Sequence, residues 1–381
     1  MSPSRLRLLF VLGTRPEVVK LAPVIRAART DSRFSATLLH SGQHLELADE
    51  MFRLFDLKPD ISLSVMEPNQ SLFSVSARIL ERLAPVFATD RYDMIVIQGD
   101  TTTAFLGALA GYYTKTPVAH VEAGLRTFDR FSPFPEEMNR RLAGALTELH
   151  FPPTEAARQN LLREGFDDNM ITVTGNTVID ALLWALELPY QPSGDIREIL
   201  SGSHRLVLVT SHRRESFGEP HRRVFKALRT LADKHADIRL LFPVHPNPNV
   251  RAQVAELLGH HPRITLCAPL GYLDFINAMK RATLILSDSG GVQEEAPTLK
   301  KPVLVLRDHT ERPEGLSSGA LRLVGTDDQK ILTEADRLLT DPAAYQAMTK
   351  NPNPYGDGKA SERILDAISR YFSKRESQTR A

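Results

Sequence analysis

Residues 283–295 begin with the apolar run Thr283-Leu284-Ile285-Leu286 and continue as Ser287-Asp288-Ser289-Gly290-Gly291-Val292-Gln293-Glu294-Glu295. This order predicts a strand, a glycine turn and the first turn of a helix. Such a turn presents unpaired backbone N–H groups, and the helix dipole makes its surroundings positive, so a phosphate is a natural ligand. The acids two turns later suit ribose hydroxyls. The same residues also fit an ordinary capped helix, with Ser289 as the N-cap and acids in the first turn.

Further polar segments follow apolar runs in the same way, and they favour the ligand-binding interpretation. Each begins where a predicted strand ends, which in an open parallel sheet is the edge that binds ligands. The segments are Gly13–Lys20 after Leu6–Leu12, Gly99–Thr103 after Met94–Gln98, Glu122–Arg126 after Pro117–Val121, Ser211–Ser216 after Arg205–Thr210, and Arg307–Glu314 after Pro302–Leu306. Structural polar residues placed at random would not gather at these ends.

Strand-like runs alternate with helical patterns along the whole chain. The remaining strands are predicted at Ala36–His40, Leu149–Phe151, Ile171–Val173, Ile238–Phe242 and Ile264–Leu266. This alternation predicts parallel sheets with helices on both faces. We therefore expect an α/β protein with two Rossmann-like, doubly wound domains that face each other across a cleft.

The length of 381 residues suits two domains of roughly 150–200 residues each. Leu188–Ser203 contains two prolines and two glycines, a composition typical of a linker. We predict an N-terminal domain over residues 1–176 and a C-terminal domain over residues 177–360. An amphipathic helix at about residues 361–373 is expected to pack back on the first domain, and residues 374–381 are expected to form a frayed tail.

The composition indicates an ordinary soluble protein. The chain has 47 Lys and Arg against 46 Asp and Glu, so no basic surplus points to nucleic acid or to an anionic membrane. Its single cysteine, Cys267, cannot form an internal disulfide, which suits the cytosol. The apolar run Leu8–Leu12 is too short for a signal sequence or a membrane span. A cytoplasmic location is predicted.

Several cofactor classes are excluded by missing motifs. The first strand is followed by Gly13-Thr14-Arg15-Pro16 in place of a Gly-x-Gly-x-x-Gly turn, which argues against bound NAD. Neither half contains the P-loop pattern of a nucleotide kinase. The histidines show no spacing typical of metal ligands. No cofactor and no metal are expected.

Three carboxylates on neighbouring loops of the first domain are candidates for acid/base chemistry: Asp100, Glu122 and Glu136. Acids that converge on one cleft would have pKa values raised by burial and by mutual repulsion, as general acid/base pairs do. Simpler roles exist for two of them. Asp100 could cap the helix that begins at Thr101, and Glu136 could complement a helix dipole. Glu122 directly follows an apolar run where no cap is needed.

Positive charge is predicted on loops of both domains. His212, Arg213 and Arg214 follow a strand of the second domain, and they favour an anion site over a structural histidine. Arg15, Lys20 and Arg312 would add to it. Cationic character without a metal suits a diphosphate that leaves during the reaction and must be stabilised as it does.

These motifs together resemble the bacterial non-hydrolysing UDP-N-acetylglucosamine 2-epimerases. The resemblance runs in order from about Leu6 to about Leu365. It rests on Gly13–Glu17, Gly99–Thr103, Val121–Thr127, Pro135–Glu137, Gly175–Asp180, His212–Ser216, Ser287–Pro297 and Thr310–Glu314.

The resemblance implies two Rossmann-like domains of glycosyltransferase B-type architecture, an active site between them and a homodimer. It also implies that UDP-N-acetylglucosamine and UDP-N-acetylmannosamine are interconverted by elimination of UDP to 2-acetamidoglucal and re-addition. Carried over, Asp100, Glu122 and Glu136 are the acid/base candidates, and His212 assists at the diphosphate. Arg15, Lys20, Ser289, Gly290, Gly291 and Arg312 would hold the phosphates, Glu295 the ribose and Phe275 the uracil.

The resemblance further implies a possible regulatory site for a second UDP-N-acetylglucosamine, at Gln43, His44, Gln70, Arg213 and His245, with Glu136 shared. Here the sequence departs from the family. Leu45 and Asn69 stand where Arg is frequent, and Glu46 where Gln occurs. Loss of two cations and gain of an anion predict weak or absent activation. Leu270 also replaces a frequent Gln near the base, which affects uracil binding only lightly.

Two other functions are compatible with this architecture. A B-type glycosyltransferase would share the nucleotide-sugar cleft, but it would need an acceptor cleft and only one base. A non-catalytic nucleotide-sugar sensor would have little need for Asp100, Glu122 and Glu136 together. The acid cluster therefore favours the epimerase.

Overall fold

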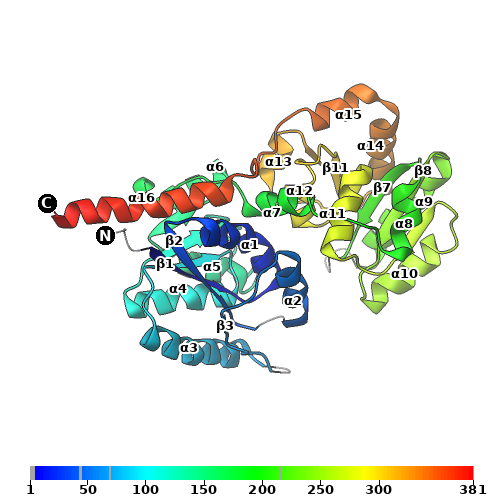
Figure 1. Ribbon diagram of the computed structural model, residues 1–381. Helices are drawn as coiled ribbons and strands as arrows, with labels where there is room; N and C mark the ends of the chain where they lie inside the picture. The colour runs from blue at the N-terminus through cyan, green and yellow to red at the C-terminus, as the bar shows by residue number, and fades with distance from the viewer. Residues whose placement is uncertain (1–4, 43–44, 68–69, 214–216, 381) are drawn as a thin grey trace. The chain divides into compact units, whose positions relative to one another are not determined.

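The computed structural model describes residues 5–42, 45–67, 70–213 and 217–380, and the chain divides into two units. Unit 1 comprises Met1–Trp184 and Gly356–Ala381, and unit 2 comprises Ala185–Tyr355. Figure 1 shows the helices and strands of both.

Among the described residues, unit 1 contains a six-stranded sheet whose neighbouring strands all run parallel. In spatial order the strands are β3 (Ile61–Ser62), β2 (Phe34–His40), β1 (Leu6–Leu12), β4 (Met94–Gln98), β5 (Val118–Val121) and β6 (Leu149–Phe151). The central strands β4 and β5 are buried along their whole length. Strands buried on both faces are near-continuous apolar runs, and in β4 and β5 only Gln98 and His120 interrupt them.

Helices connect and cover these strands. They are α1 (Arg15–Thr30), α2 (Leu45–Leu54), α3 (Leu72–Thr89), α4 (Thr102–Thr114), α5 (Glu136–Ala145), α6 (Glu155–Arg163), the short 3-10 helix η1 (Asp168–Met170), α7 (Thr177–Ala185) and α16 (Ala360–Arg380). Residues of α3 and α4 form one hydrophobic core with β1 and β4. The last helix, α16, lies against α1 and buries Ile364, Leu365 and Ile368 (Figure 1).

The described part of unit 2 repeats this architecture. Its parallel sheet has the order β12 (Leu321–Leu323), β11 (Val303–Val305), β10 (Ala282–Ser287), β7 (Arg205–Thr210), β8 (Ile238–Pro243) and β9 (Ile264–Cys267). The helices are α8 (Gly194–Ser201), α9 (Glu219–Lys234), α10 (Pro248–Leu258), α11 (Tyr272–Arg281), α12 (Gly290–Glu295), α13 (Pro313–Ser317), α14 (Asp328–Thr340) and α15 (Pro342–Thr349). The predicted α/β class with two Rossmann-like domains is confirmed.

The strand order locates the ligand-binding edge of each sheet. In unit 1 the chain winds outward in one direction from β1 and then in the other from β4, and in unit 2 it does the same from β7 and β10. Loops that leave two such strands diverge and open a crevice at their carboxyl ends, where doubly wound folds bind ligands. Ligand-binding residues are therefore expected on the loops that follow β1 and β4 in unit 1, and on those that follow β7 and β10 in unit 2.

The domain boundary lies further along the chain than the predicted residue 176. Helix α7 belongs to unit 1 because its Asp180 carboxylate accepts the backbone N–H groups of Ala360 and Ser361, at 3.2 and 2.8 Å. Trp184 also stacks on Phe55, with ring centroids 5.0 Å apart. The connection to unit 2 therefore starts after Trp184. At the other end, α16 extends to Arg380, beyond the predicted residue 373.

Some secondary-structure predictions were wrong. Ile171–Val173 is not a strand, because only Ile171 makes an isolated bridge, to His150. The predicted linker Leu188–Ser203 contains α8. Strands β3 and β12 were not predicted, since they have two and three residues and short runs carry little periodicity.

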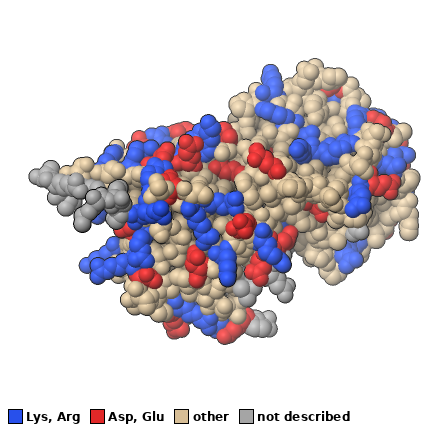
Figure 2. All heavy atoms as spheres, viewed as in Figure 1, with Lys and Arg blue, Asp and Glu red and all other residues tan. Residues whose placement is uncertain are grey.

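The surface agrees with the balanced composition. Basic and acidic side chains are interspersed on the face shown in Figure 2. None of the described helices is both long enough and apolar enough to cross a membrane.

Candidate functional site

The carboxylate of Glu122 is tightly constrained at the crevice of unit 1. It directly follows β5, only 8% of the residue is exposed, and its backbone is left-handed with φ of 63°. Its N–H donates to the carbonyl of Phe151 on the adjacent strand, at 3.0 Å. A non-glycine residue in this region costs free energy, and such residues cluster at functional sites.

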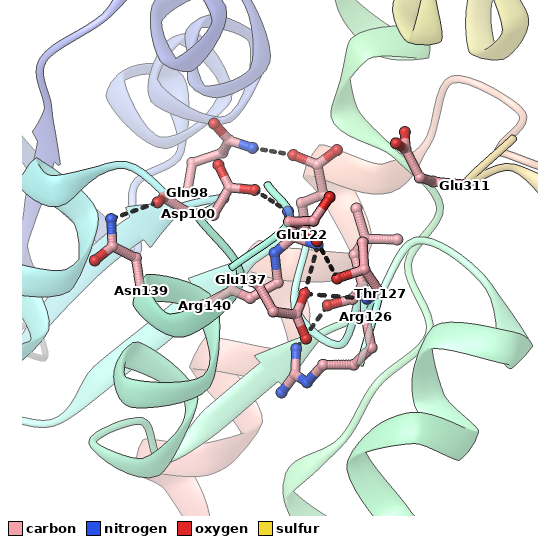
Figure 3. Close-up of polar contacts among 12 residues, drawn as sticks. Gln98, Asp100, Glu122, Arg126, Thr127, Glu137, Asn139, Arg140 and Glu311 are labelled. Atoms are coloured by element: carbon pink, nitrogen blue, oxygen red, sulfur yellow. Dashed lines mark hydrogen bonds and ion pairs between the residues drawn. The ribbon is translucent and has the colours of Figure 1, made fainter. Parts of the chain in front are cut away.

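Three polar side chains from different segments hold the Glu122 carboxylate. Lys20 of α1 lies 2.5 Å from Oε1 and 2.7 Å from Oε2. Asn176 donates to Oε1 at 3.2 Å, and Gln98, the last residue of β4, donates to Oε2 (Figure 3). The ammonium of Lys20 therefore compensates a nearly buried negative charge. A contact of Lys20 with a phosphate, which the resemblance implies, stays a prediction.

Asp100 lies on the adjacent loop, two residues after the end of β4. Its Oδ2 accepts a hydrogen bond from Arg140 at 2.5 Å, and its carbonyl accepts one from Asn139 at 3.0 Å. Both partners come from α5 (Figure 3). Thr101, not Asp100, caps the following helix, because its hydroxyl accepts the N–H of Ala104 at 3.0 Å. The simpler capping role considered for Asp100 is thereby removed.

The third acid, Glu136, is the first residue of α5 and is half-buried. Its neighbour Glu137 is fully buried and accepts the N–H groups of Thr127 and Phe128, at 3.0 and 3.3 Å. Glu137 therefore fixes the loop before α5, whereas Glu136 makes no hydrogen bond or ion pair with the described residues. Glu136 lies in the first turn of α5, so its charge also complements the helix dipole, which is the simpler role considered for it.

Two of the three acids are paired with cations. Lys20 pairs with Glu122, and Arg140 pairs with Asp100. Mutual repulsion among the three acids stays a prediction. Arg15, the first residue of α1, is half-buried and makes no hydrogen bond or ion pair with the described residues.

Glu17 is a residue of this crevice that the sequence analysis missed. Its carboxylate is buried and accepts N–H groups from Gly13 (3.1 Å) and Thr14 (2.7 Å) and the hydroxyls of Thr14 (2.7 Å) and Thr101 (2.7 Å). It therefore joins the loop after β1 to the loop after β4, which carries Asp100. Burial raises the pKa of Glu17 to about 7 despite these hydrogen bonds. Its place in the motif Gly13–Glu17 was the available signal.

In unit 2, the loops after β7 and β10 meet through Asp288 and His212. The fully buried Asp288 accepts the backbone N–H groups of His212 and Arg213 at 2.6 and 2.8 Å, and its Oδ1 lies 2.9 Å from His212 Nδ1. The His212 ring stacks on His245, with centroids 6.0 Å apart and an interplanar angle of 18°. The structure thus places the His212 ring, predicted to act in catalysis, against that of His245, predicted for the regulatory site. Asp288 was quoted in a motif but given no role.

The predicted phosphate turn has the expected form. Helix α12 begins at Gly290, and Ser289 N–H donates to the Ser287 hydroxyl at 3.0 Å. A Cβ on Gly290 would lie 3.0 Å from Cζ of Arg312, so glycine is needed for the guanidinium to approach the turn. Arg312 also contacts Glu294 Oε1, at 2.8 Å from Nη2.

The residues predicted to bind the nucleoside also lie in unit 2. Glu295 is buried, and the Tyr272 hydroxyl donates to its Oε1 at 3.4 Å. Phe275 is half-buried and lies three residues after Tyr272 on the same helix, α11. The first turn of α11 is thus held beside the carboxylate expected to bind ribose.

Part of the predicted regulatory set can be located. Gln70 of unit 1 accepts a hydrogen bond from Arg78 at 3.0 Å. Gln43, His44 and Asn69 lie outside the described residues, as do the side chains of Leu45 and Glu46. Within the described part of the chain, no group of three or more His, Cys, Asp or Glu could hold a metal ion.

Comparison with known proteins identifies the relatives of this chain. The family model described as UDP-N-acetylglucosamine 2-epimerase matches residues 26–369. The chain is 49% identical, over 370 residues, to the UDP-N-acetylglucosamine 2-epimerase of Escherichia coli strain K12, which covers 95% of this chain and 98% of that one. Among solved structures, the Neisseria meningitidis UDP-GlcNAc 2-epimerase bound to UDP-GlcNAc is 40% identical, with a TM-score of 0.85. The match covers 96% of this chain and 100% of that one. S. aureus MnaA, solved with UDP, is 42% identical, with a TM-score of 0.85 and 97% coverage of both chains.

Proposed function

The chain belongs to the UDP-N-acetylglucosamine 2-epimerase family, and from this premise we propose that it interconverts UDP-N-acetylglucosamine and UDP-N-acetylmannosamine. The reaction inverts carbon 2 of the sugar. A route that needs no NAD is supported by Gly13-Thr14-Arg15-Pro16, which stands where a dinucleotide-binding protein has its glycine-rich turn.

The proposed chemistry is elimination followed by re-addition. A carboxylate removes the proton from C2, and the C–H electron pair forms a double bond between C1 and C2. The C1–O bond breaks, and its electron pair leaves on the diphosphate, which gives 2-acetamidoglucal and UDP. In the second half a diphosphate oxygen of UDP attacks C1, and the double bond accepts a proton at C2 on the opposite face.

The observation that carries this proposal is the environment of Glu122. The Glu122 carboxylate is nearly buried, follows an interior strand of the sheet and has left-handed backbone. Three polar side chains contact it, so its orientation is fixed. Proton transfer by positioned side chains contributes about 10²- to 10⁴-fold to rate, so such fixing suits acid/base chemistry. Asp100 and Glu136 are the other acid/base groups of the proposal. Asp100 is oriented by Arg140, and Glu136 is not engaged by other described residues.

Unit 2 is proposed to bind the nucleotide. Ser289, Gly290, Gly291 and Arg312 would contact the phosphates, together with Arg15 and Lys20 of unit 1, and His212 would assist at the diphosphate as it leaves. Glu295 would bind the ribose and Phe275 would lie against uracil. Support comes from the position of the turn beside the β7 and β10 carboxyl ends, and from the S. aureus and N. meningitidis relatives solved with UDP and with UDP-GlcNAc.

A homodimer and a cytoplasmic location are part of the proposal. Large apolar side chains on unit 1 are exposed, among them Phe73 at 89% and Tyr113 at 67%, which suits a protein interface. The single cysteine and a nucleotide-sugar substrate suit the cytoplasm. Light scattering at micromolar concentration should give twice the 42.5 kDa chain mass, and a monomer mass would reject the dimer.

Incubation with UDP-N-acetylglucosamine in deuterated water, without NAD or metal, tests the function. The protein should form UDP-N-acetylmannosamine with deuterium at C2, and the Glu122→Gln variant serves as the background control. Epimerisation without deuterium uptake would reject the elimination mechanism. Free sugar as the main stable product would identify a hydrolase instead.

A further inference from the structure

The buried carboxylate of Asp288 has no task in the mechanism proposed so far. Asp288 is the first residue after β10 and is fully buried. It nevertheless contacts the loop after β7 at three points: the N–H groups of His212 and Arg213, and the imidazole of His212. Buried carboxylates are costly unless their charge is compensated, so this arrangement needs a reason.

The two oxygens of Asp288 have different partners. Oδ2 accepts both backbone N–H groups and so fixes the course of the loop. Oδ1 lies 2.9 Å from His212 Nδ1, an ion-pair distance, and no hydrogen bond to it meets the usual geometry among the described residues. A purely structural role would need only Oδ2. Oδ1 is thus devoted to the imidazole.

The contact decides which ring nitrogen of His212 is free. A carboxylate opposite Nδ1 favours the tautomer with the proton on Nδ1, so Nε2 forms the outer edge of the ring. The His212 side chain is 40% exposed, whereas that of Asp288 is 0% exposed. The accessible edge of the ring is therefore the one that carries Nε2. The stacked ring of His245 further restrains the orientation.

Asp288 is suited to this task because it is ionised. Burial acts to raise the pKa of Asp288, but the hydrogen bond and charge of His212 and the two backbone N–H groups outweigh it, so the pKa lies below its ordinary value. The negative charge of Asp288 stabilises the imidazolium that forms when Nε2 of His212 takes up a proton, and the protonated Nε2 can then donate a hydrogen bond to an anion.

We propose that Asp288 is a positioning residue that holds neutral His212 in the Nδ1–H tautomer, so that Nε2 can take up a proton and then donate it in a hydrogen bond to the departing diphosphate. The diphosphate part rests on the proposed function, whereas the tautomer does not depend on any activity. Asp288 itself touches no reacting atom and acts through His212.

Nuclear magnetic resonance of the ring nitrogens tests the tautomer. The protein is labelled with ¹⁵N in its 12 histidines, and His212 is assigned by the signals that disappear in His212→Gln. Neutral His212 in the wild type should show protonated Nδ1 and unprotonated Nε2, and Asp288→Asn should shift this pattern toward Nε2–H. A wild-type spectrum with Nε2–H, or ring signals that Asp288→Asn leaves unchanged, would overturn the proposal. The wild-type spectrum decides even if Asp288→Asn does not fold.

Kinetics test the consequence for the reaction. Asp288→Asn should lower kcat roughly tenfold to a hundredfold, a large part of what a positioned acid/base group contributes, while the Kd of UDP changes less than about threefold. The matched control is His221→Phe, which removes the 3.0 Å contact between His221 Nε2 and the Ser211 hydroxyl in the same loop but keeps an aromatic ring. It should change kcat less than about threefold. An equal loss in both variants would mean that Asp288 only anchors the loop.

These measurements separate the two proposals. A protein with the Nδ1–H tautomer but no epimerase activity would support the positioning of His212 and reject the proposed function. An active epimerase with the Nε2–H tautomer would support the proposed function and reject the positioning of His212 by Asp288.

Discussion

Lys20 Nζ lies 2.5 Å from Glu122 Oε1, although 102 residues separate the two in the chain. Their side chains are 17% and 5% exposed, so water screens the pair little. Breaking a buried pair leaves one charge uncompensated and costs more than the net free energy of the pair itself. Lys20 is therefore needed to keep Glu122 in place, whether or not it also meets a phosphate.

Replacement of Lys20 by Met should lower the free energy of unfolding by about 3 kcal/mol, the lower end for a broken buried pair, because Gln98 and Asn176 still contact Glu122. The double variant Lys20→Met/Glu122→Gln should be more stable than Lys20→Met alone, since the stranded charge is gone. Urea unfolding of the wild type, of Lys20→Met, of Glu122→Gln and of the double variant gives the coupling free energy. Additive effects would mean that the two residues do not stabilise each other.

Variants of the proposed acids and of the nucleotide contacts should fail differently. Asp100→Asn, Glu122→Gln and Glu136→Gln should each reduce kcat about a hundredfold or more, with a smaller effect on UDP affinity. Arg312→Ala and Glu295→Ala should first weaken UDP binding. Steady-state kinetics and calorimetric titration with UDP separate the two classes.

The control for that series is Glu155→Gln, a carboxylate that is 61% exposed and paired with Arg158 at the start of α6. It should leave both kcat and UDP affinity unchanged. Normal turnover by the three acid variants would show that those carboxylates serve the fold alone.

His150 should make the fold sensitive to acid. Burial lowers the pKa of His150 to about 3, so the unfolded chain binds this proton first as the pH falls. Neutral, buried His150 contributes fully to stability above about pH 6.5, the ordinary pKa of histidine. This contribution is lost as the pH falls toward the pKa of His150 in the folded chain. Between pH 6.5 and 5, wild type should lose about 2 kcal/mol more than His150→Phe in urea unfolding. The exposed His309, replaced by Gln, is the control and should retain the wild-type slope; a wild-type slope in His150→Phe would contradict the prediction.

Glu17 should act with the opposite sign. Its pKa is raised to about 7 by burial, so the folded chain holds this proton more tightly than the unfolded one. Its contribution is full below about pH 4.5 and is lost as the pH rises through about 7. The free energy of unfolding of Glu17→Gln lacks this dependence on pH. As the pH rises from 4.5 to 8, the wild type should therefore lose about 3 kcal/mol of its stability relative to Glu17→Gln. A difference that stays constant with pH would show that Glu17 does not titrate in this range.

Activation by a second substrate molecule should be weak or absent. Leu45 and Asn69 replace frequent cations of the family, Glu46 adds an anion, and each lost charge-assisted contact is worth about 1.5–3 kcal/mol. The reverse reaction, started from UDP-N-acetylmannosamine alone, should therefore proceed without a lag. A long lag that traces of UDP-N-acetylglucosamine abolish would show that Gln43, His44, Gln70, Arg213 and His245 suffice for a regulatory site.

Much of the fold follows from local patterns. Strands with the predicted bounds form at Leu6–Leu12, Met94–Gln98, Leu149–Phe151 and Arg205–Thr210, because strands of a parallel sheet covered on both faces are near-continuous apolar runs. The position of candidate residues at strand ends follows too. Ile171–Val173 shows the limit of this reasoning. Its composition suits a strand, but pairing there is confined to one bridge with His150.

The partners of the candidate residues could not be predicted in the same way. Glu17 is four residues from Gly13, but its link to the loop of Asp100 runs through Thr101, 84 residues away. Asp288 and the N–H of His212 are 76 residues apart. Neither separation has a signature in hydrophobic periodicity, because side-chain contacts across a sheet depend on which strands become neighbours.

By itself, the sequence determined the α/β class, the strand ends that carry the candidate residues and the family. These follow from periodicity and from motifs, which are properties of neighbouring residues. Only the tertiary structure decided that Lys20 contacts a carboxylate, that Arg140 orients Asp100, that Glu17 joins two loops and that Asp288 fixes the ring of His212. Each of these contacts joins segments that burial of the apolar core brings together. Which charges pair therefore depends on their distance and on the exclusion of water, and not on their order along the chain.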